Sequence, residues 1–185
     1  MTFNDWHLSC GTRAREQNDK TRDTRHMMQD ETRTVEADVV VIGGGGAGLA
    51  AAIEAAGRGA KVILLEKNAS LGGSTAWSVG SISATRTPHQ KARGIDDNPD
   101  DHYEDMEVLA GSYANRDNRA LRRILVDRTT ETLAWLEDMG VVFVGPNVEP
   151  PHRRPRMHNV LPNSKAFPYH LGRRAERLGV IVKTE

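Results

Sequence analysis

The chain of 185 residues has little of several residue types on which whole classes of protein depend. It contains one cysteine, Cys10, which excludes an internal disulfide framework and suits a reducing compartment. Aromatic residues make up only 5% of the chain, which argues against a stacking platform for single-stranded nucleic acid. The 25 basic residues equal the 25 acidic ones, so the molecule has no net charge with which to attract a polyanion. We expect no nucleic-acid partner.

Long apolar runs and metal-ligand clusters are also missing from the sequence. The most apolar stretch, residues 47–65, is interrupted by Glu54, Arg58 and Lys61, well short of the ~20 apolar residues of a membrane span. Residues 1–36 are polar and densely charged, without the apolar core of a signal peptide. No histidines or cysteines stand at metal-ligand spacing. We therefore expect no membrane segment, a cytoplasmic location and no metal.

The composition divides the chain into two parts. Residues 1–36 mix both charges with Thr, Asn and Gln and have no helical or strand periodicity, which predicts a disordered arm. An alternative is that the true first residue is Met27 or Met28. Residues 37–185 are patterned and are expected to form one α/β domain with a parallel sheet.

That patterned part begins with a strand, a helix and a second strand. Residues 39–42 are a continuous β-branched run, which predicts a buried parallel strand. Residues 47–58 are rich in alanine and predict a helix, and residues 61–65 predict the next strand. The result is a Rossmann-like βαβ unit of about thirty residues.

Further along the chain, helices are predicted at 99–110, 118–139 and 167–178, and strands at 141–144 and 180–183. Residues 67–95 and 145–163 are predicted to be loops. The apolar face of the second of these helices is expected to consist of Leu121, Ile124, Leu125, Leu133 and Leu136.

Glycines follow the first strand at the spacing of a dinucleotide-binding turn. Gly43 permits the tight turn, Gly45 lets the backbone approach a pyrophosphate, and Gly48 lets the helix pack closely on the strand. The N–H groups at the start of the helix, at Gly46 and Ala47, then face the phosphates.

An acid and a second glycine-rich loop complete the pattern. Glu66 ends the second strand, 18 residues after Gly48, where its carboxylate can accept hydrogen bonds from an adenosine ribose and would repel a 2′-phosphate. The loop Gly72-Gly73-Ser74-Thr75 offers further N–H and O–H donors. The glycine turn itself fits FAD and NAD equally, whereas this loop favours FAD.

These motifs resemble the FAD-binding domain of the fumarate reductase/succinate dehydrogenase flavoprotein family, which includes L-aspartate oxidase and 3-ketosteroid dehydrogenases. The resemblance rests on VVVIGGGGAGLAAAIEAA, on LLEK and on LGGSTAWSVGSISA, in residues 39–84. It implies bound FAD and hydride transfer between flavin N5 and a substrate C–C bond. Histidine is absent from residues 72–80, where respiratory members attach the flavin, so we expect non-covalent FAD. The expected cofactor-binding residues are Gly43, Gly45, Gly46, Ala47, Gly48, Glu66, Lys67, Gly72, Gly73, Ser74, Thr75, Ser78 and Gly80.

Catalytic residues cannot be transferred from the family, whose substrate-binding groups lie largely in later segments. Arg156 and His158, in a basic tract at residues 149–165, are candidates for binding a substrate carboxylate or a flavin phosphate, and a solvated basic loop is the alternative. The implied substrate is a small molecule such as a dicarboxylate or a steroid.

Three hypotheses remain at this point. The first is an FAD-dependent oxidoreductase whose ADP-binding part is this chain, truncated before the sheet is complete and before the capping domain. The second is an NAD-linked Rossmann dehydrogenase. The third is a non-catalytic FAD-binding fragment that needs a C-terminal half or a partner chain.

Overall fold

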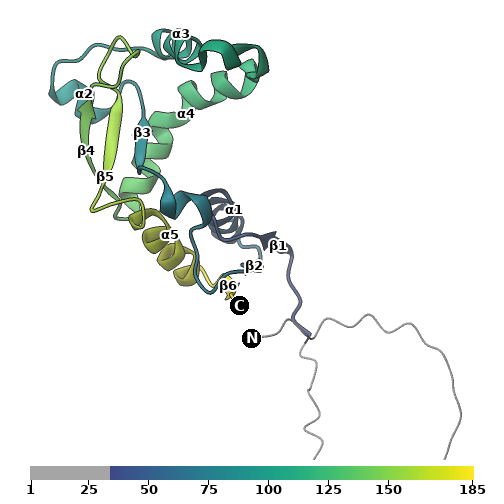
Figure 1. The fold of residues 1–185 in the computed structure, drawn as a ribbon. Helices are drawn as coiled ribbons and strands as arrows, with labels where there is room; N and C mark the ends of the chain where they lie inside the picture. The colour runs from purple at the N-terminus through teal and green to yellow at the C-terminus, as the bar shows by residue number, and fades with distance from the viewer. Residues whose placement is uncertain (1–33) are drawn as a thin grey trace, which may run out of the picture. The chain divides into compact units, whose positions relative to one another are not determined.

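The computed structural model describes residues 34–185, and the predicted arm at 1–36 lies outside this part except for its last three residues. Strand β1 (Val39–Ile42), helix α1 (Gly46–Gly57) and strand β2 (Val62–Leu65) follow one another as predicted (Figure 1). Strands β1 and β2 pair in parallel, with Val39 opposite Val62. The predicted βαβ unit is therefore confirmed.

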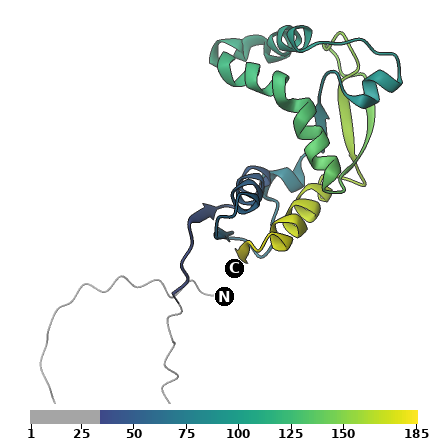
Figure 2. The ribbon, with the colours of Figure 1, turned by 180° about the vertical axis from the view of Figure 1, so that it is seen from behind.

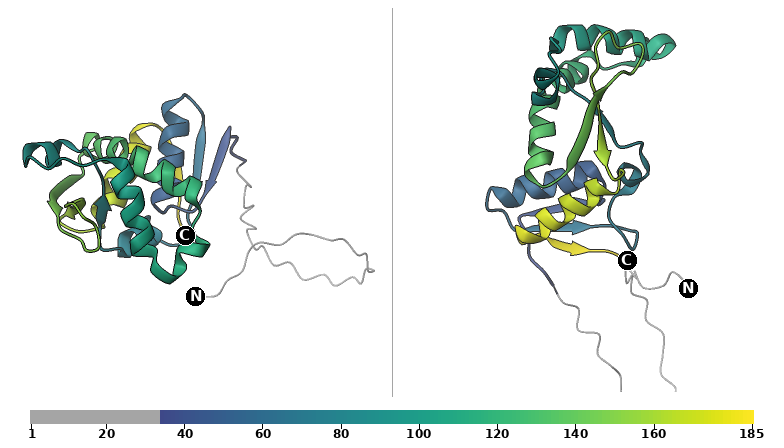
Figure 3. Two further views of the ribbon diagram at one scale, coloured as in Figure 1. Left: turned by 90° about the horizontal axis from the view of Figure 1, so that it is seen from above. Right: turned by 90° about the vertical axis from the view of Figure 1, so that its left-hand side faces the viewer.

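A third strand joins this sheet from the far end of the chain. Helix α5 (Ala166–Arg177) leads into β6 (Ile181–Lys183), which pairs in parallel with β2 and gives the strand order β1-β2-β6. Helices α1 and α5 pack side by side (Figure 3). Their apolar residues form a core with the strands, in which Leu49, Ala52, Leu64, Leu171 and Ala175 are buried.

The prediction that residues 39–42 form a fully buried strand is wrong for half of the strand. Val40 is 55% exposed and Ile42 is 86% exposed, whereas Val39 and Val41 pack against the core. Alternate side chains of a strand point to opposite faces of the sheet. Within residues 34–185 the helices of the core cover one face, so the alternate residues of β1 face outward.

A second sheet lies where the sequence predicts mostly loops. Strands β3 (Ser81–Ser83), β4 (Val142–Asn147) and β5 (Met157–Leu161) pair antiparallel in the order β3-β5-β4 (Figure 2). The sequence predicts β4 but neither β3 nor β5. Strand β3 has only three residues and β5 reads Met-His-Asn-Val-Leu, so pairing with distant partners rather than local periodicity forms them.

Two of the helices between β3 and β4 begin directly after asparagines that cap them. The side chain of Asn98 accepts a hydrogen bond from the Asp101 backbone N–H (2.8 Å) at the start of α3 (Pro99–Ala110). Asn118 caps α4 (Arg119–Asp138) in the same way. Short helices complete the chain: α2 (Pro88–Ala92) and the 3₁₀ segments η1 (Gly73–Trp77) and η2 (Gly111–Arg116).

The expected apolar face of α4 is only half correct. Leu133 and Leu136 are buried, but Leu121, Ile124 and Leu125 are exposed. Arg122 is buried in their place, next to the carboxylates of Glu107 and Asp117. Its guanidinium lies 4.3 Å from the centre of the Tyr103 ring. Ion pairs and a cation–π contact therefore decide which side of the first half of α4 faces inward.

Candidate functional site

The glycine turn between β1 and α1 has the geometry that its spacing predicts. Gly43 adopts a φ of 100°, which strains other residues, and donates its N–H to the Leu65 carbonyl (2.7 Å). A Cβ atom on Gly48 would lie 1.9 Å from the Gly43 carbonyl oxygen, so the helix passes the turn closely. At Gly45 the nearest atom to such a Cβ is the Gly72 carbonyl oxygen at 3.8 Å. The backbone is thus open at the residue that should face a pyrophosphate.

Glu66 lies buried at the end of β2 and is tied to this turn. Its Oε2 accepts the Gly44 N–H at 2.7 Å. Its Oε1 accepts two hydrogen bonds from Asn68, from the backbone N–H at 2.9 Å and from the side-chain amide at 2.7 Å. The bond from Gly44 and those from Asn68 outweigh burial and lower the pKa of Glu66. The carboxylate is therefore ionised and fixed in orientation at neutral pH.

The second glycine-rich loop lies against the first. The Gly72 N–H donates to the Gly44 carbonyl at 2.8 Å, and Gly45 and Gly72 form an isolated parallel bridge. The Gly46 N–H, at the start of α1, donates to the Thr75 hydroxyl at 3.1 Å. Two loops that are about thirty residues apart in sequence are thus joined at the N-terminus of one helix.

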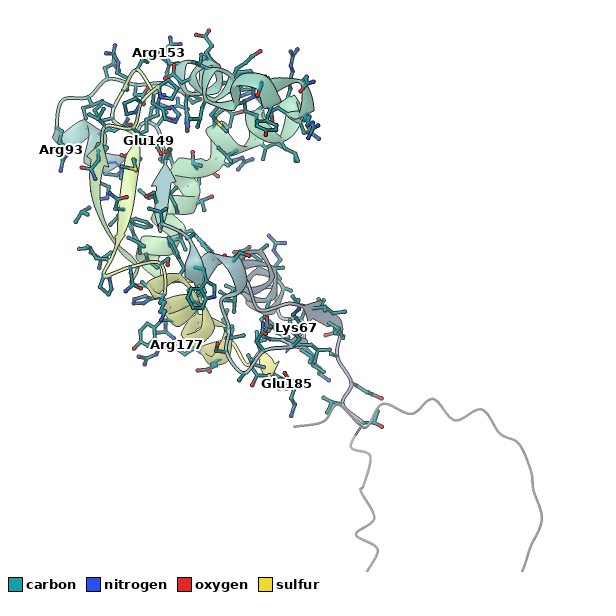
Figure 4. The ribbon with its side chains drawn as sticks, in the orientation of Figure 1. Lys67, Arg93, Glu149, Arg153, Arg177 and Glu185 are labelled. Carbon is teal, nitrogen blue, oxygen red and sulfur yellow. The ribbon has the colours of Figure 1, made fainter. Side chains whose placement is uncertain are left out.

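The remaining predicted residues of this region surround the two loops. The Ser78 hydroxyl donates to the Thr75 carbonyl (2.9 Å) and accepts the Gly80 N–H (3.2 Å), which holds the end of η1. Ala47 and Ser74 are exposed, and so is Lys67, which follows Glu66 at the end of β2 (Figure 4).

A cavity of about 690 Å³ borders the second loop. Gly73 and Trp77 of η1 form one part of its lining, and Asn68 forms another. Lys165 and Tyr169, at the start of α5, also line it, with the Lys165 amine 5.9 Å from the centre of the Trp77 ring. The cavity therefore combines an apolar wall with one cation, beside the loop that carries Thr75.

Arg156, a candidate substrate ligand, has no exposed surface. Its Nε and Nη2 donate to the two carboxylate oxygens of Asp97, both at 2.7 Å, and its Nη1 donates to Asp105 at 2.5 Å. Burial raises the pKa of Asp105, but hydrogen bonds from Arg153 and Arg156 outweigh it and bring the pKa to about 2. The guanidinium is thus committed to two buried carboxylates of its own chain.

His158, the other candidate, is equally buried. Its Nδ1 lies 2.7 Å from the Arg156 carbonyl, which can only accept, so Nδ1 carries the proton. Its Nε2 then accepts from the Thr87 hydroxyl at 3.1 Å. Burial lowers the pKa of His158, which keeps the ring neutral. Neither Arg156 nor His158 lies beside the glycine loops, and a role in substrate binding stays a prediction for both.

Comparison with known proteins identifies the family and its cofactor. Residues 38–175 match the FAD_binding_2 family, which is described as an FAD binding domain. The chain belongs to this family of FAD-binding domains. The family's cofactor is FAD, which agrees with the choice that the second loop favours over NAD.

Two solved structures share the fold. The flavocytochrome c3 fumarate reductase has a TM-score of 0.73 at 26% identity, over 80% of this chain and 26% of that one. The 3-ketosteroid-Δ4-(5α)-dehydrogenase from Rhodococcus jostii RHA1 has a TM-score of 0.69 at 30% identity, over 86% of this chain and 40% of that one. The expected likeness to fumarate reductases and ketosteroid dehydrogenases is confirmed.

A curated relative agrees with this assignment. The NADH:fumarate oxidoreductase of Klebsiella pneumoniae (strain 342) is 40% identical over 106 residues, which is 57% of this FAD-binding chain. The match spans only 11% of that relative's length. The chain therefore corresponds to one part of a much larger flavoprotein.

The geometry of this FAD-binding chain fits the cofactor. The backbone is open at Gly45, helix α1 begins next to it at Gly46, and an oriented carboxylate lies at the end of β2 in Glu66. These groups suit a pyrophosphate followed by an adenosine ribose. Within residues 34–185, no group of three or more His, Cys, Asp or Glu side chains is placed to hold a metal ion. The same part of the chain has no helix long and apolar enough to cross a membrane.

Proposed function

We propose that this chain binds the ADP part of FAD, without a covalent bond, in an oxidoreductase of the fumarate reductase/succinate dehydrogenase flavoprotein type. Bound FAD supplies hydride transfer between its N5 and a substrate C–C bond. The observation that carries the proposal is the junction of the two glycine loops at the N-terminus of α1, made by the Gly72–Gly44 and Gly46–Thr75 hydrogen bonds.

Each part of the junction has its own task in this proposal. The α1 N-terminus and the N–H group of Gly73 stabilise the pyrophosphate charge. Glu66 accepts from the ribose, and the hydroxyls of Ser74 and Thr75 hold the chain of the cofactor beyond the phosphates. The absence of histidine from residues 72–80 supports non-covalent attachment.

The substrate and the partner are proposed from the relatives. Fumarate reductases and a ketosteroid dehydrogenase share this fold, so we propose a small dicarboxylate or a steroid as the substrate class. The catalytic groups are then supplied by a part of the protein beyond these residues, either in the same chain or in a partner chain. A cytoplasmic location is part of the same proposal.

Replacing Gly45 tests the site without disturbing the fold. A Cβ atom at Gly45 meets only the Gly72 carbonyl at 3.8 Å, so Gly45→Ala should fold but obstruct the pyrophosphate. We expect FAD affinity to fall at least about tenfold in a fluorescence titration, which corresponds to about 1.4 kcal/mol. The flavin should be released by acid precipitation, and NADH should bind more weakly than FAD.

The matched control is Gly57→Ala, in the last turn of the same helix, where an added Cβ meets no atom within 4 Å. Its FAD affinity should equal that of the unsubstituted chain. Equal FAD binding by the Gly45 and Gly57 variants would contradict the proposed placement of the pyrophosphate.

A further inference from the structure

Asn68 makes contacts that the dinucleotide-binding pattern does not predict. It stands two residues after Glu66 and gives Oε1 both a backbone and a side-chain hydrogen bond, at 2.9 and 2.7 Å. A carboxylate at neutral pH only accepts hydrogen bonds, so the Asn68 side chain must turn its NH₂ group toward Glu66. This fixes the direction of the Asn68 amide as well as that of the carboxylate.

The contacts divide the two oxygens of Glu66 between different tasks. Each carboxylate oxygen has about two acceptor positions, and both positions of Oε1 are filled by Asn68. Oε2 accepts once, from Gly44 at 2.7 Å. One acceptor position, on Oε2, is thus left for a ligand, although a ribose presents two adjacent hydroxyl groups.

A second acceptor is available on Asn68 itself. With NH₂ turned toward Glu66, its Oδ1 points away from the carboxylate, and no group within residues 34–185 donates a hydrogen bond to it. Asn68 is exposed and lines the cavity of about 690 Å³, whereas Glu66 is buried. Oδ1 of Asn68 and Oε2 of Glu66 are therefore the two acceptors at this end of β2.

We propose that Asn68 is a positioning and binding residue of the adenosine-ribose site, which orients Glu66 through Oε1 and offers its own Oδ1 to the second ribose hydroxyl. The proposal rests on the proposed FAD function. It assigns the two hydroxyls to two residues, where the usual pattern names only the carboxylate as the ribose acceptor. Asn68 thereby disfavours a ribose that carries a 2′-phosphate. Its NH₂ group is already bonded to Glu66, and its Oδ1 is an acceptor, which cannot pair with a phosphate oxygen.

The experiment measures binding of ADP, 2′-deoxy-ADP and 3′-deoxy-ADP to the complete chain by calorimetry. We expect Asn68→Ala to weaken ADP binding about five- to tenfold, the loss expected for one hydrogen bond and its orientation. In the unsubstituted chain both deoxy nucleotides should bind more weakly than ADP. In Asn68→Ala, one of them should bind as well as ADP, because its missing hydroxyl has lost its acceptor.

Two further measurements separate this role from a structural one. Asn68 contributes to the low pKa of Glu66, so Asn68→Ala should move the acidic limit of ADP binding to higher pH. Ser70→Ala, in the same loop and on the same cavity, should leave ADP affinity, the preference between nucleotides and the pH limit unchanged.

The outcomes distinguish the two proposals. Unchanged or tighter ADP binding by Asn68→Ala overturns the inference about Asn68. The proposed function is still upheld in that case if the unsubstituted chain binds FAD. An equal loss for ADP and both deoxy nucleotides also overturns it, because Asn68 would then act on the fold alone. Failure of the unsubstituted chain to bind FAD or ADP overturns both.

Discussion

At the scale of single residues, the second half of the molecule contains a cluster of buried, paired charges. Arg156, Asp97 and Asp105 come from three separate segments and lie together without access to water. Removing one member of a buried ion pair leaves its partner desolvated and unpaired, which costs far more than the pair itself contributes. The basic tract at residues 149–165 is therefore held in place by the buried ion pairs of Arg156.

The Arg156 network predicts a large loss on substitution. Arg156→Met removes the cation and leaves two buried carboxylates, so the free energy of unfolding should fall by about 3–5 kcal/mol. Arg154→Met, two residues away and exposed, should change it by no more than about 0.5 kcal/mol. Urea denaturation of both variants measures the difference, and equal stabilities would contradict the assigned burial.

The same cluster predicts how stability depends on pH. Burial, with the Arg156 charge, lowers the pKa of His102 from 6.5 to about 4. Between pH 6.5 and 4 the unfolded chain takes up a proton that the folded chain refuses, so stability decreases as the pH falls. Below pH 4, Asp105 continues the decrease down to about pH 2, because its pKa is lowered from 3.8.

Denaturation midpoints at pH 7, 5.5 and 4.5 measure this effect. His102→Gln should have a smaller pH dependence over that interval, since the titrating group is gone. His152 and His158, whose pKa values burial also lowers, should keep part of the slope. A slope identical to that of the unsubstituted chain would show that His102 is not the titrating group.

At the scale of elements, α4 shows how an amphipathic pattern is divided between two environments. Its second half packs Leu133 and Leu136 into the core, whereas its first half buries Arg122 and exposes three aliphatic side chains. Periodicity alone places all five apolar residues on one face. Arg122 forms ion pairs with α3 and with the preceding loop, and these pairs turn the charged side of the first half of α4 inward.

This division predicts that replacing leucine by alanine changes the free energy of unfolding much more in the second half of α4 than in the first. Leu133→Ala should lower the free energy of unfolding by about 2–5 kcal/mol, through lost burial and the cavity left behind. Leu121→Ala, at a side chain 62% exposed, should have an effect below about 0.5 kcal/mol. Comparable losses in thermal or urea unfolding would place Leu121 in a packed environment instead.

At the scale of the whole molecule, one face of the parallel sheet remains apolar and exposed within the described residues. Val40, Ile42, Leu65 and Ile181 contribute to it: Ile42 lies opposite Leu65, and Val40 and Ile181 lie on either side of Ile63. Strand β1 is also an edge strand, with backbone groups available for pairing on one side. Exposed apolar edges of this kind favour association.

Association of the 185-residue chain should therefore depend on β1. We expect Ile42→Lys to reduce the fraction of higher-mass species at high protein concentration, with little change in unfolding free energy, because Ile42 is 86% exposed. Light scattering coupled to size exclusion measures the change. Lys183→Ala, on the exposed edge strand β6, serves as a control, and a similar reduction there would contradict a specific role of β1.

Much of the nucleotide site could be predicted from the sequence because its determinants are local. Gly43, Gly48 and Glu66 have backbone or strand-end positions that a short pattern specifies. The Gly46–Thr75 contact and the role of Asn68 could not, since they depend on how a loop returns to the helix. Strands β3 and β5 could not be predicted from the sequence either, because each forms only by pairing with a segment at least ten residues away.

The sequence by itself determined the βαβ unit, its glycine turn, the membership of an FAD-binding family and the expected cofactor. The βαβ unit and its turn follow from hydrophobic periodicity, chain stiffness at β-branched residues and the unique freedom of glycine, which act over a few residues, whereas the family and its cofactor come from the resemblance of the motifs to known FAD-binding domains. Only the tertiary structure decided that Arg156 is an internal anchor, that α4 turns Arg122 inward, and that Asn68 holds Glu66. Those outcomes depend on desolvation and on hydrogen-bond partners that are brought together from distant segments.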